Sequence, residues 1–354
     1  MTTEHTSPIR VVIADDSTIA LRLLSGILEA QPDIRVVALA HDGVEALEAV
    51  KTHDPDVLCT DLHMPNMDGL ELTRQVMASC PCPILVISVS VQDDDRTNIF
   101  QLTHAGAVDV FPKPRGGLSS ADQRFADGLA RRVRTLARVD VFRRRTTPAS
   151  TSRSAPARAP RRTPPRRPHV IAIGASTGGV QTMEAIVQAL PGGYRIPILY
   201  IQHISEGFQP SLISWLDGRG PIKVKEINAG ALPLPGHVYL PPEGHHLGID
   251  GIGHVQTPQT PPRNGHRPSI DITFETVADY YGATAMGVLL TGMGRDGATG
   301  LRAIRDAGGH TVAQDPEEAI VSGMPRAAVE MDAATEVLPL ERIIALLLSF
   351  DPRS

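Results

Sequence analysis

Short apolar runs recur along the first third of the chain and alternate with segments whose apolar residues return every three or four positions. Such runs are typical of strands buried on both faces of a parallel sheet, and the longer segments of amphipathic helices. The predicted strands are Ile9–Ala14, Val36–Ala40, Val57–Thr60, Ile84–Ile87 and Val108–Phe111, and the predicted helices are Ile19–Leu28, Val44–Val50, Leu70–Met77 and Asp95–Thr103. Residues 8–120 are therefore expected to form a doubly wound α/β domain.

The same alternation resumes at residue 169 and defines a second expected domain, residues 169–350. An apolar run at Val170–Ile173 leads into a glycine-rich turn and then into a helical pattern. Further buried strands are predicted at Ile196–Ile201 and Val288–Thr291. The second domain is thus also expected to be a doubly wound parallel sheet.

Residues 121–168 are predicted to be a helix followed by a flexible linker. The apolar spacing from Ser120 to Arg145 indicates a helix, whereas Arg143–Pro168 holds nine arginines, no acid, and many prolines. A segment of this composition cannot bury enough apolar surface to offset its ordering entropy. We interpret it as a solvated tether. Binding of nucleic acid or anionic lipid is the alternative, although no aromatic residues are interleaved to stack on bases.

The composition agrees with two aliphatic cores in a protein of 354 residues, of which 42% are hydrophobic and only 4% aromatic. No apolar run approaches the roughly 20 residues that span a bilayer, and the first ten residues lack the apolar core of a signal peptide. The three cysteines, Cys59, Cys80 and Cys82, are odd in number, which argues against a disulfide scaffold. We therefore expect a cytoplasmic protein without membrane insertion.

Acidic residues follow the predicted strands of the first domain at the edge where such folds build their sites. Asp15 and Asp16 follow the first strand, Asp61 follows the third, Ser88 ends the fourth, and Lys113 follows the fifth. Three converging carboxylates repel one another unless a hard cation such as Mg²⁺ lies among them. The lysine and the hydroxyl could hold phosphoryl oxygens, so the set predicts phosphoryl transfer to a carboxylate.

These residues resemble the receiver domain of bacterial two-component response regulators. The resemblance rests on DDS at 15–17, DLHMPNMDGLEL at 61–72, Ser88, and FPKP at 111–114. It implies a flavodoxin-like fold and phosphorylation of Asp61 in the presence of Mg²⁺. It also implies that Asp15, Asp16 and the backbone carbonyl of His63 bind the metal with Asp61, that Ser88 is the switch hydroxyl, and that Lys113 contacts the phosphate.

The glycine-rich turn of the second domain, residues 174–179, places Ser176 between a strand and a helix. A nucleotide-phosphate loop is one alternative, but the G-x-G-x-x-G spacing and the Walker lysine are absent. An ordinary N-cap serine is the other. We interpret Ser176 as a nucleophile, because His203 and Asp296 also follow predicted strands and can serve as its base and orienting acid. Backbone N–H groups near Thr177 and Met293 could stabilise an oxyanion.

Two other arrangements were weighed for the second domain. The G-x-S-x-G pattern also fits an α/β-hydrolase with the order Ser176, Asp296, His310, but only the arginine-rich linker precedes the serine here. Zinc binding by His237, His245, His246 and His254 lacks a cysteine or carboxylate at ligand spacing. We therefore prefer His203 as the base and expect no cofactor in this domain.

The second domain resembles the catalytic domain of the chemotaxis protein-glutamate methylesterases, the CheB family. The resemblance rests on GASTGG at 174–179, QH at 202–203, PGHVYLPPEGHHL at 235–247, RPSIDITFET at 267–276, LLTGMGRDGATGL at 289–301 and TVAQDPEEAIVSGMP at 311–325. It implies a Rossmann-like three-layer domain that demethylates receptor glutamate esters and deamidates receptor glutamines. Ser176, His203 and Asp296 carry over as nucleophile, base and orienting acid.

The combined expectation is a phosphorylation-activated esterase in chemosensory adaptation. A histidine kinase would be the phosphodonor, methyl-accepting chemoreceptors the substrate, and the receiver would shield the serine until it is phosphorylated. The rival is a response regulator whose output domain binds a partner or nucleic acid, but no recognition motif follows the receiver. An esterase acting on some other protein stays open on the sequence alone.

Overall fold

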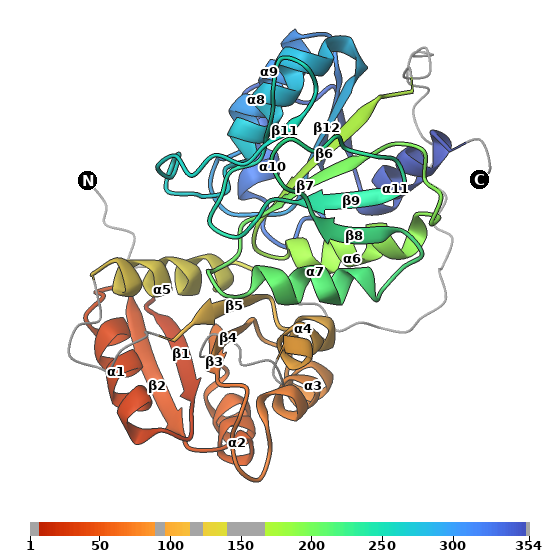
Figure 1. The fold of residues 1–354 in the computed structure, drawn as a ribbon. Coiled ribbons are helices and arrows are strands. Elements are labelled where there is room, and N and C mark those ends of the chain that lie inside the picture. Colours follow the sequence, from red (N-terminus) through yellow and green to blue (C-terminus); the bar gives the residue numbers. More distant parts are fainter. Residues whose placement is uncertain (1–6, 89–95, 114–122, 140–166, 352–354) are drawn as a thin grey trace, which may run out of the picture.

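A computed structural model describes residues 7–88, 96–113, 123–139 and 167–351 of the chain. These residues form two three-layer α/β domains (Figure 1). Most of the arginine-rich segment assigned to the tether, residues 143–166, lies outside the described residues. Among the described helices, none is long and apolar enough to cross a membrane.

The first domain is a parallel sheet of five strands in the order β2-β1-β3-β4-β5, with helices on both faces. Helices α1 and α5 share one core with the sheet, and α2, α3 and α4 share the other. This confirms the doubly wound fold predicted for the first domain. The elements are β1 Ile9–Ala14, α1 Thr18–Glu29, β2 Ile34–Ala40, α2 Gly43–His53, β3 Val57–Thr60, α3 Gly69–Ser79, β4 Ile84–Ser88, α4 Arg96–Ala105, β5 Asp109–Pro112 and α5 Gln123–Leu136.

Helix α5 belongs to the packed core of the first domain. It was expected to lie with the linker in residues 121–168, but its residues Leu129, Ala130 and Val133 are fully buried against α1 and the sheet. The apolar stripe that predicted the helix is the face it buries. The packed first domain therefore includes α5, through Leu136.

The second domain is a parallel sheet of seven strands in the order β14-β13-β12-β6-β7-β9-β8, which confirms its predicted fold class. Helices α6, α7 and α11 cover one face, and α8, α9 and α10 cover the other. A small antiparallel pair, β10–β11, precedes α8. The elements are β6 Val170–Ala175, α6 Gly179–Ala189, β7 Ile198–Gln202, α7 Gln209–Asp217, β8 Lys223–Glu226, β9 His237–Leu240, β10 Gly248–Ile249, β11 Val255–Gln256, α8 Ile270–Tyr281, β12 Ala285–Leu289, α9 Ala298–Asp306, β13 His310–Gln314, α10 Gly323–Glu330, β14 Glu336–Leu338 and α11 Leu340–Ser349.

The strand order of the second sheet reverses at β6. From β6 the chain first builds outward through β7, β8 and β9, and later builds the other half through β12, β13 and β14. In open α/β sheets a crevice forms outside the carboxyl ends of the strands at this switch point. Residues that follow β6, β7 and β12 are thereby brought to one place.

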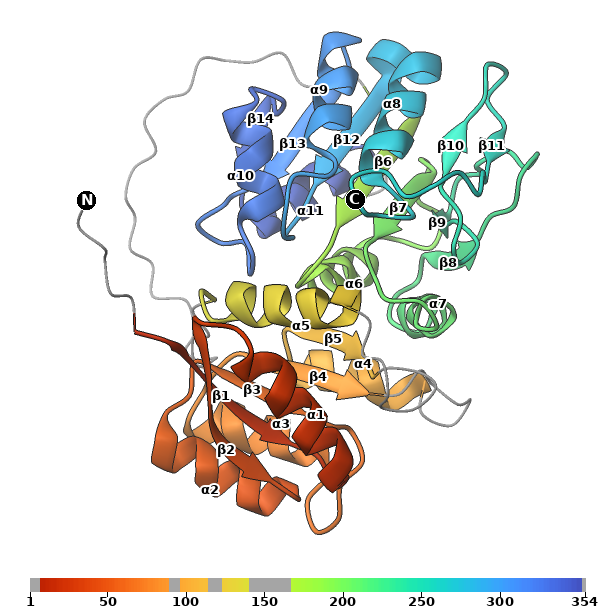
Figure 2. The same cartoon turned by 90° about the vertical axis from the view of Figure 1, so that its left-hand side faces the viewer.

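The two domains meet through the α4–β5–α5 side of the first and the α6–α7 side of the second (Figures 1 and 2). Phe100 of α4 is 1% exposed and packs in the core of the second domain, with its ring 6.2 Å from that of Trp215. In the opposite direction Phe208, which precedes α7, is 1% exposed and belongs to a core cluster of the first domain. Each domain thus inserts one phenylalanine into its neighbour.

Helices α8 and α9 approach closely where Gly300 faces Phe274. A methyl group added at Gly300 would lie 2.6 Å from Phe274 Cβ and 2.8 Å from the carbonyl oxygen of Asp271. The carbonyl cannot move without distorting α8. Only glycine therefore permits this packing distance.

Replacing Gly300 by alanine is expected to lower the free energy of unfolding by about 1–3 kcal/mol, because the methyl group overpacks the α8–α9 contact. Gly26→Ala is the matched control, because Gly26 lies inside α1 with nothing within 4 Å of an added methyl group. It should raise stability by about 0.5–1 kcal/mol through helix propensity. Urea unfolding followed by circular dichroism, and by fluorescence of the single tryptophan, Trp215, measures both. Equal shifts in the same direction would contradict the packing argument.

Candidate functional site

Ser176 is the first residue after β6 and is half-buried. Its backbone N–H donates to the carbonyl of Thr291 at 3.0 Å, and its carbonyl accepts from Gln202 Nε2 at 2.8 Å. Gln202 is in turn held by the hydroxyl of Tyr200 at 2.5 Å. These bonds fix the turn between β6 and α6, so the serine projects from a rigid backbone.

His203 lies beside this turn because β6 and β7 are neighbours in register. Ala175 pairs with Gln202, and the N–H of His203 donates to the carbonyl of Ala175 at 2.9 Å. The His203 side chain is 7% exposed, and its Nε2 lies 2.8 Å from Asp296 Oδ2. Its other ring nitrogen, Nδ1, is buried and has no hydrogen-bond partner among the described residues. The structure therefore joins the predicted base and acid, while no hydrogen bond to Nδ1 from Ser176 is formed.

Asp296 is held at the N-terminus of α8. Its Oδ2 accepts from the N–H of Ile270 at 2.7 Å, and its Oδ1 accepts from Ser269 Oγ at 2.8 Å. Burial alone would raise the pKa of Asp296, but the hydrogen bond and charge of His203, with these donors, hold that pKa well below its usual range. The carboxylate is therefore ionised at neutral pH and keeps the imidazole oriented.

His266 is a site residue that the sequence analysis did not single out. Its ring stacks on that of His203, with centroids 3.8 Å apart and planes inclined by 1°. Burial, and then the neighbouring His203, lower the pKa of His266 to about 4, so it is neutral near pH 7. It covers one face of the His203 ring. No periodicity or spacing in the sequence signals this, because the stack depends on the path of the loop before α8.

The first domain contacts the second domain at both positions where oxyanion donors were expected. Thr177 Oγ1 donates to Asp109 Oδ2 of β5 at 2.9 Å, and the same carboxylate pairs with Arg132 of α5. Thr135 Oγ1 of α5 lies 2.7 Å from Met293 Sδ and 2.9 Å from the carbonyl oxygen of Arg131, either of which can accept its proton. A cavity of about 1350 Å³ between the domains is lined by Met293, but neither Ser176 nor His203 lines it.

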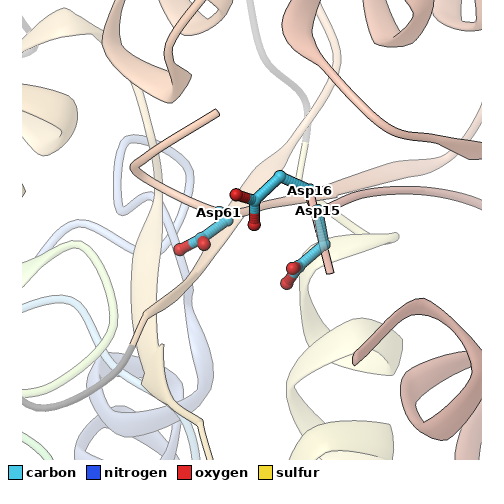
Figure 3. Close-up of side chains that lie close together, drawn as sticks. All are labelled: Asp15, Asp16 and Asp61. Carbon is cyan, nitrogen blue, oxygen red and sulfur yellow. The ribbon is translucent and has the colours of Figure 1, made fainter. Parts of the chain in front are cut away.

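The acidic cluster of the first domain forms as predicted. Figure 3 shows Asp15 and Asp16, which follow β1, beside Asp61, which follows β3. One oxygen from each carboxylate lies within 4.8 Å of the others. Asp61 is 8% exposed, and its Oδ1 accepts from the N–H of Leu62 at 2.7 Å. The side chain of His63 is exposed.

Lys113 is the cation of this site, because its Nζ lies 2.7 Å from Oδ2 of both Asp15 and Asp61. Burial raises the pKa of Asp61, the lysine opposes this, and the charge of Asp15 adds to it. Burial would lower the pKa of Lys113, but the two carboxylates outweigh it and raise that pKa. Ser88 ends β4 and is 3% exposed, and its carbonyl accepts from the N–H of Lys113 at 2.7 Å. Lys113 therefore pairs with two of the three clustered carboxylates, and the three together are a donor set of hard oxygens that fits a divalent cation.

The rejected arrangements do not form. His310 begins β13 and pairs with Glu336 at 3.2 Å rather than with Asp296. His246 is fully buried, and its Nδ1 accepts from the N–H of Ser269, which supports the residue that holds Asp296. Within the described part of the chain, Asp15, Asp16 and Asp61 are the only group of three or more His, Cys, Asp or Glu residues whose ligand atoms cluster closely enough for a shared metal ion.

Comparison with known families gives two matches, one for each domain. Residues 11–118 match the response regulator receiver domain, and residues 171–347 match the family described as CheB methylesterase. A solved structure, the CheB methylesterase catalytic domain of Thermotoga maritima, is 35% identical with a TM-score of 0.50 and covers 52% of this chain and 99% of its own.

Curated relatives match both domains together. A protein-glutamate methylesterase/protein-glutamine glutaminase of Nitrosospira multiformis is 39% identical over 96% of each chain. Namesakes in Myxococcus xanthus and Pseudomonas aeruginosa are 41% and 39% identical, over 97% and 96% of each chain. The chain therefore belongs to the protein-glutamate methylesterase/protein-glutamine glutaminase family, with a receiver domain ahead of a CheB methylesterase domain.

Proposed function

We propose that this protein is a phosphorylation-controlled hydrolase that removes methyl esters from glutamates of chemoreceptors and deamidates receptor glutamines. The observation that carries the proposal is the buried pair of His203 and Asp296 at the switch point of the second sheet, next to Ser176. The family and the paired receiver support the substrate class and the control. Membership of this family also supports a cytoplasmic setting for the reaction.

Ser176 is the nucleophile, and Nδ1 of His203 is the base. Because Asp296 accepts the proton on Nε2, the lone pair of the neutral imidazole lies on Nδ1. The two ring nitrogens thus exchange the roles they have in the serine-protease triad. Substrate binding is proposed to close the hydrogen bond between Ser176 and His203, as catalytic contacts often tighten only in the complex.

The reaction proceeds in two acyl transfers. The Ser176 oxygen attacks the ester carbonyl as His203 takes its proton, and the ester C–O bond breaks as the imidazolium gives that proton to the departing methoxide oxygen, which leaves as methanol. Water then attacks the acyl-serine by the same proton path and releases glutamate. For glutamine the leaving group is ammonia. Backbone N–H groups at Thr177 and Met293 are proposed to hold the oxyanion, a role in which one donor contributes roughly 10²–10³ in rate.

Ser176→Ala is expected to lower methanol release from methylated receptor membranes by at least about 10⁴-fold, because the acyl-enzyme cannot form. Gas-phase transfer of labelled methanol measures the rate. Ser349→Ala is the control, because Ser349 ends α11 and bonds only a local carbonyl, that of Leu346. A Ser176→Ala rate near that of wild type would refute the nucleophile assignment.

Asp61 is the proposed phosphoacceptor, with a histidine kinase as donor. Asp15, Asp16, Asp61 and the His63 carbonyl would hold Mg²⁺, which when bound neutralises charge on the transferring phosphoryl group. Lys113 then contacts a phosphoryl oxygen in place of its present carboxylate partners, and Ser88 lies at the end of the adjacent strand. The support is the convergence of these side chains and the receiver family.

Asp61→Asn is expected to abolish acid-labile, Mg²⁺-dependent phosphate incorporation from acetyl phosphate, measured by intact-protein mass spectrometry. Asp68→Asn, an exposed N-cap residue of α3 near the same loop, should incorporate phosphate as wild type does. Phosphate persisting in the Asp61→Asn protein would place the acceptor elsewhere.

The unphosphorylated receiver is proposed to shield the serine site. Support comes from the contacts of Asp109 and Thr135 with the residues that carry the expected oxyanion donors. Both contacts start from β5 and α5, which follow the strand that ends in Ser88 and flank Lys113. A rearrangement at the phosphorylation site therefore has a short structural route to this interface.

Asp109→Ala is expected to raise the basal esterase rate several-fold, because it removes the acceptor that ties Thr177 to the receiver. Asp33→Ala is a matched control, because Asp33 also pairs with an arginine of α5, Arg134, but contacts only the receiver. Methanol release without phosphodonor compares the two variants. Equal rates in wild type and the Asp109→Ala variant would argue against shielding through the contact between Asp109 and Thr177.

A further inference from the structure

A second buried carboxylate lies beside Asp296, and nothing in the proposed reaction uses it. Asp271, in the first turn of α8, is 1% exposed. Its Oδ1 accepts from the N–H groups of Gly297 and Gly300, both at 2.8 Å. Gly297 is the residue directly after Asp296, and both N–H groups lie at the start of α9.

The two helices exchange capping carboxylates. Asp296 precedes α9 but binds N–H groups at the start of α8, those of Ile270 at 2.7 Å and Asp271 at 3.3 Å. Asp271 belongs to α8 but binds the first turn of α9. The unpaired N–H groups at the start of each helix are thereby satisfied by the acid of the other helix. Neither helix start can shift without breaking a bond to the other.

This exchange fixes the loop that carries the proposed acid and the Met293 oxyanion donor. The loop joins β12 to α9, and its end at Gly297 adopts a φ of 91°. Asp271 accepts a hydrogen bond from the N–H of Gly297 at that end of the loop. The carboxylate of Asp296, one residue earlier, accepts from the N–H of Ile270 at the start of α8. Burial raises the pKa of Asp271 to about 6, and the charge of Asp296 contributes to this increase. The hydrogen bond from the N–H of Gly300 opposes it. Burial of this carboxyl group is compensated by its two hydrogen bonds to the start of α9.

We propose that Asp271 is a positioning residue for the esterase reaction, which anchors the 292–297 loop so that Asp296 and the Met293 N–H meet their targets. The inference rests on the proposed function of the Ser176 site. It assigns to Asp271 no contact with substrate. Misplacing a catalytic group by about 1 Å can lower the rate by 10²-fold, so the anchor should act on turnover rather than on substrate affinity.

The test compares Asp271→Ala and Asp271→Asn in the full chain, with methanol release measured over a range of methylated receptor concentrations. Asp271→Ala should lower kcat by about 10–100-fold with KM within about twofold of wild type. Asp271→Asn should lower kcat by only about 3–10-fold, because the amide oxygen accepts the same two bonds without the assistance of charge. The stimulation by acetyl phosphate should be unchanged, since Asp271 makes its bonds within the second domain.

Thr273→Val is the matched control. Thr273 is fully buried two residues further along α8, and its hydroxyl holds the carbonyl of Leu247 instead of the start of α9. It should lower stability with kcat unchanged once the folded fraction is taken into account.

Three results would overturn the inference: wild-type kcat in the Asn variant, a change confined to KM, or a loss matched by Thr273→Val. Because the Asn variant preserves the buried shape, it decides the question even where the Ala variant does not fold. A wild-type protein that releases no methanol would instead refute the proposed function, so the two failures are distinguishable.

Discussion

The charge of Asp296 is taken out of water almost completely, and the arrangement around it follows from that. An ionised carboxylate buried without partners costs several kcal/mol, so its oxygens must be met by donors. The first-turn N–H groups of α8, the hydroxyl of Ser269 and the ring of His203 supply them. Holding the carboxylate of Asp296 therefore also orients the imidazole of His203. His246 and Asp271 add further support, because they accept hydrogen bonds from the N–H groups of Ser269 and Gly297.

Both domains place their chemistry at the carboxyl ends of parallel strands, and these two edges are joined through one interface. The proposed phosphoacceptor, Asp61, follows β3, Lys113 follows β5, and β5 itself begins at Asp109, which contacts Thr177. On the receiver side, strand β5 alone separates Lys113 of the acidic cluster from Asp109 at the domain interface. Coupling of this kind needs no extended pathway, because a small shift of one strand alters a contact next to the serine.

The parts of this architecture that the sequence predicts are those set by local patterns. Buried strands appear in the sequence as short apolar runs, and the polar residues that follow them can be identified by position. Asp15 and Asp61 could therefore be assigned to one site, and His203 and Asp296 to another, from the sequence alone. The role of α5 was less visible, because an amphipathic helix has the same pattern whether it packs on the receiver or precedes a linker. His266 and Asp271 depend on loop path and on the meeting of two helix starts distant in sequence. No local pattern encodes such contacts.

The exchanged phenylalanines have a consequence for the separation of the domains. Phe100 and Phe208 are each sheltered by the opposite domain. Parting the domains would wet two aromatic rings at once, and apolar surface costs about 25 cal/mol per Å² when it is returned to water. The separated form would thus expose apolar patches on both domains, around Phe208 on the second and Phe100 on the first. Such patches favour recapture of the receiver unless another apolar surface occupies them first.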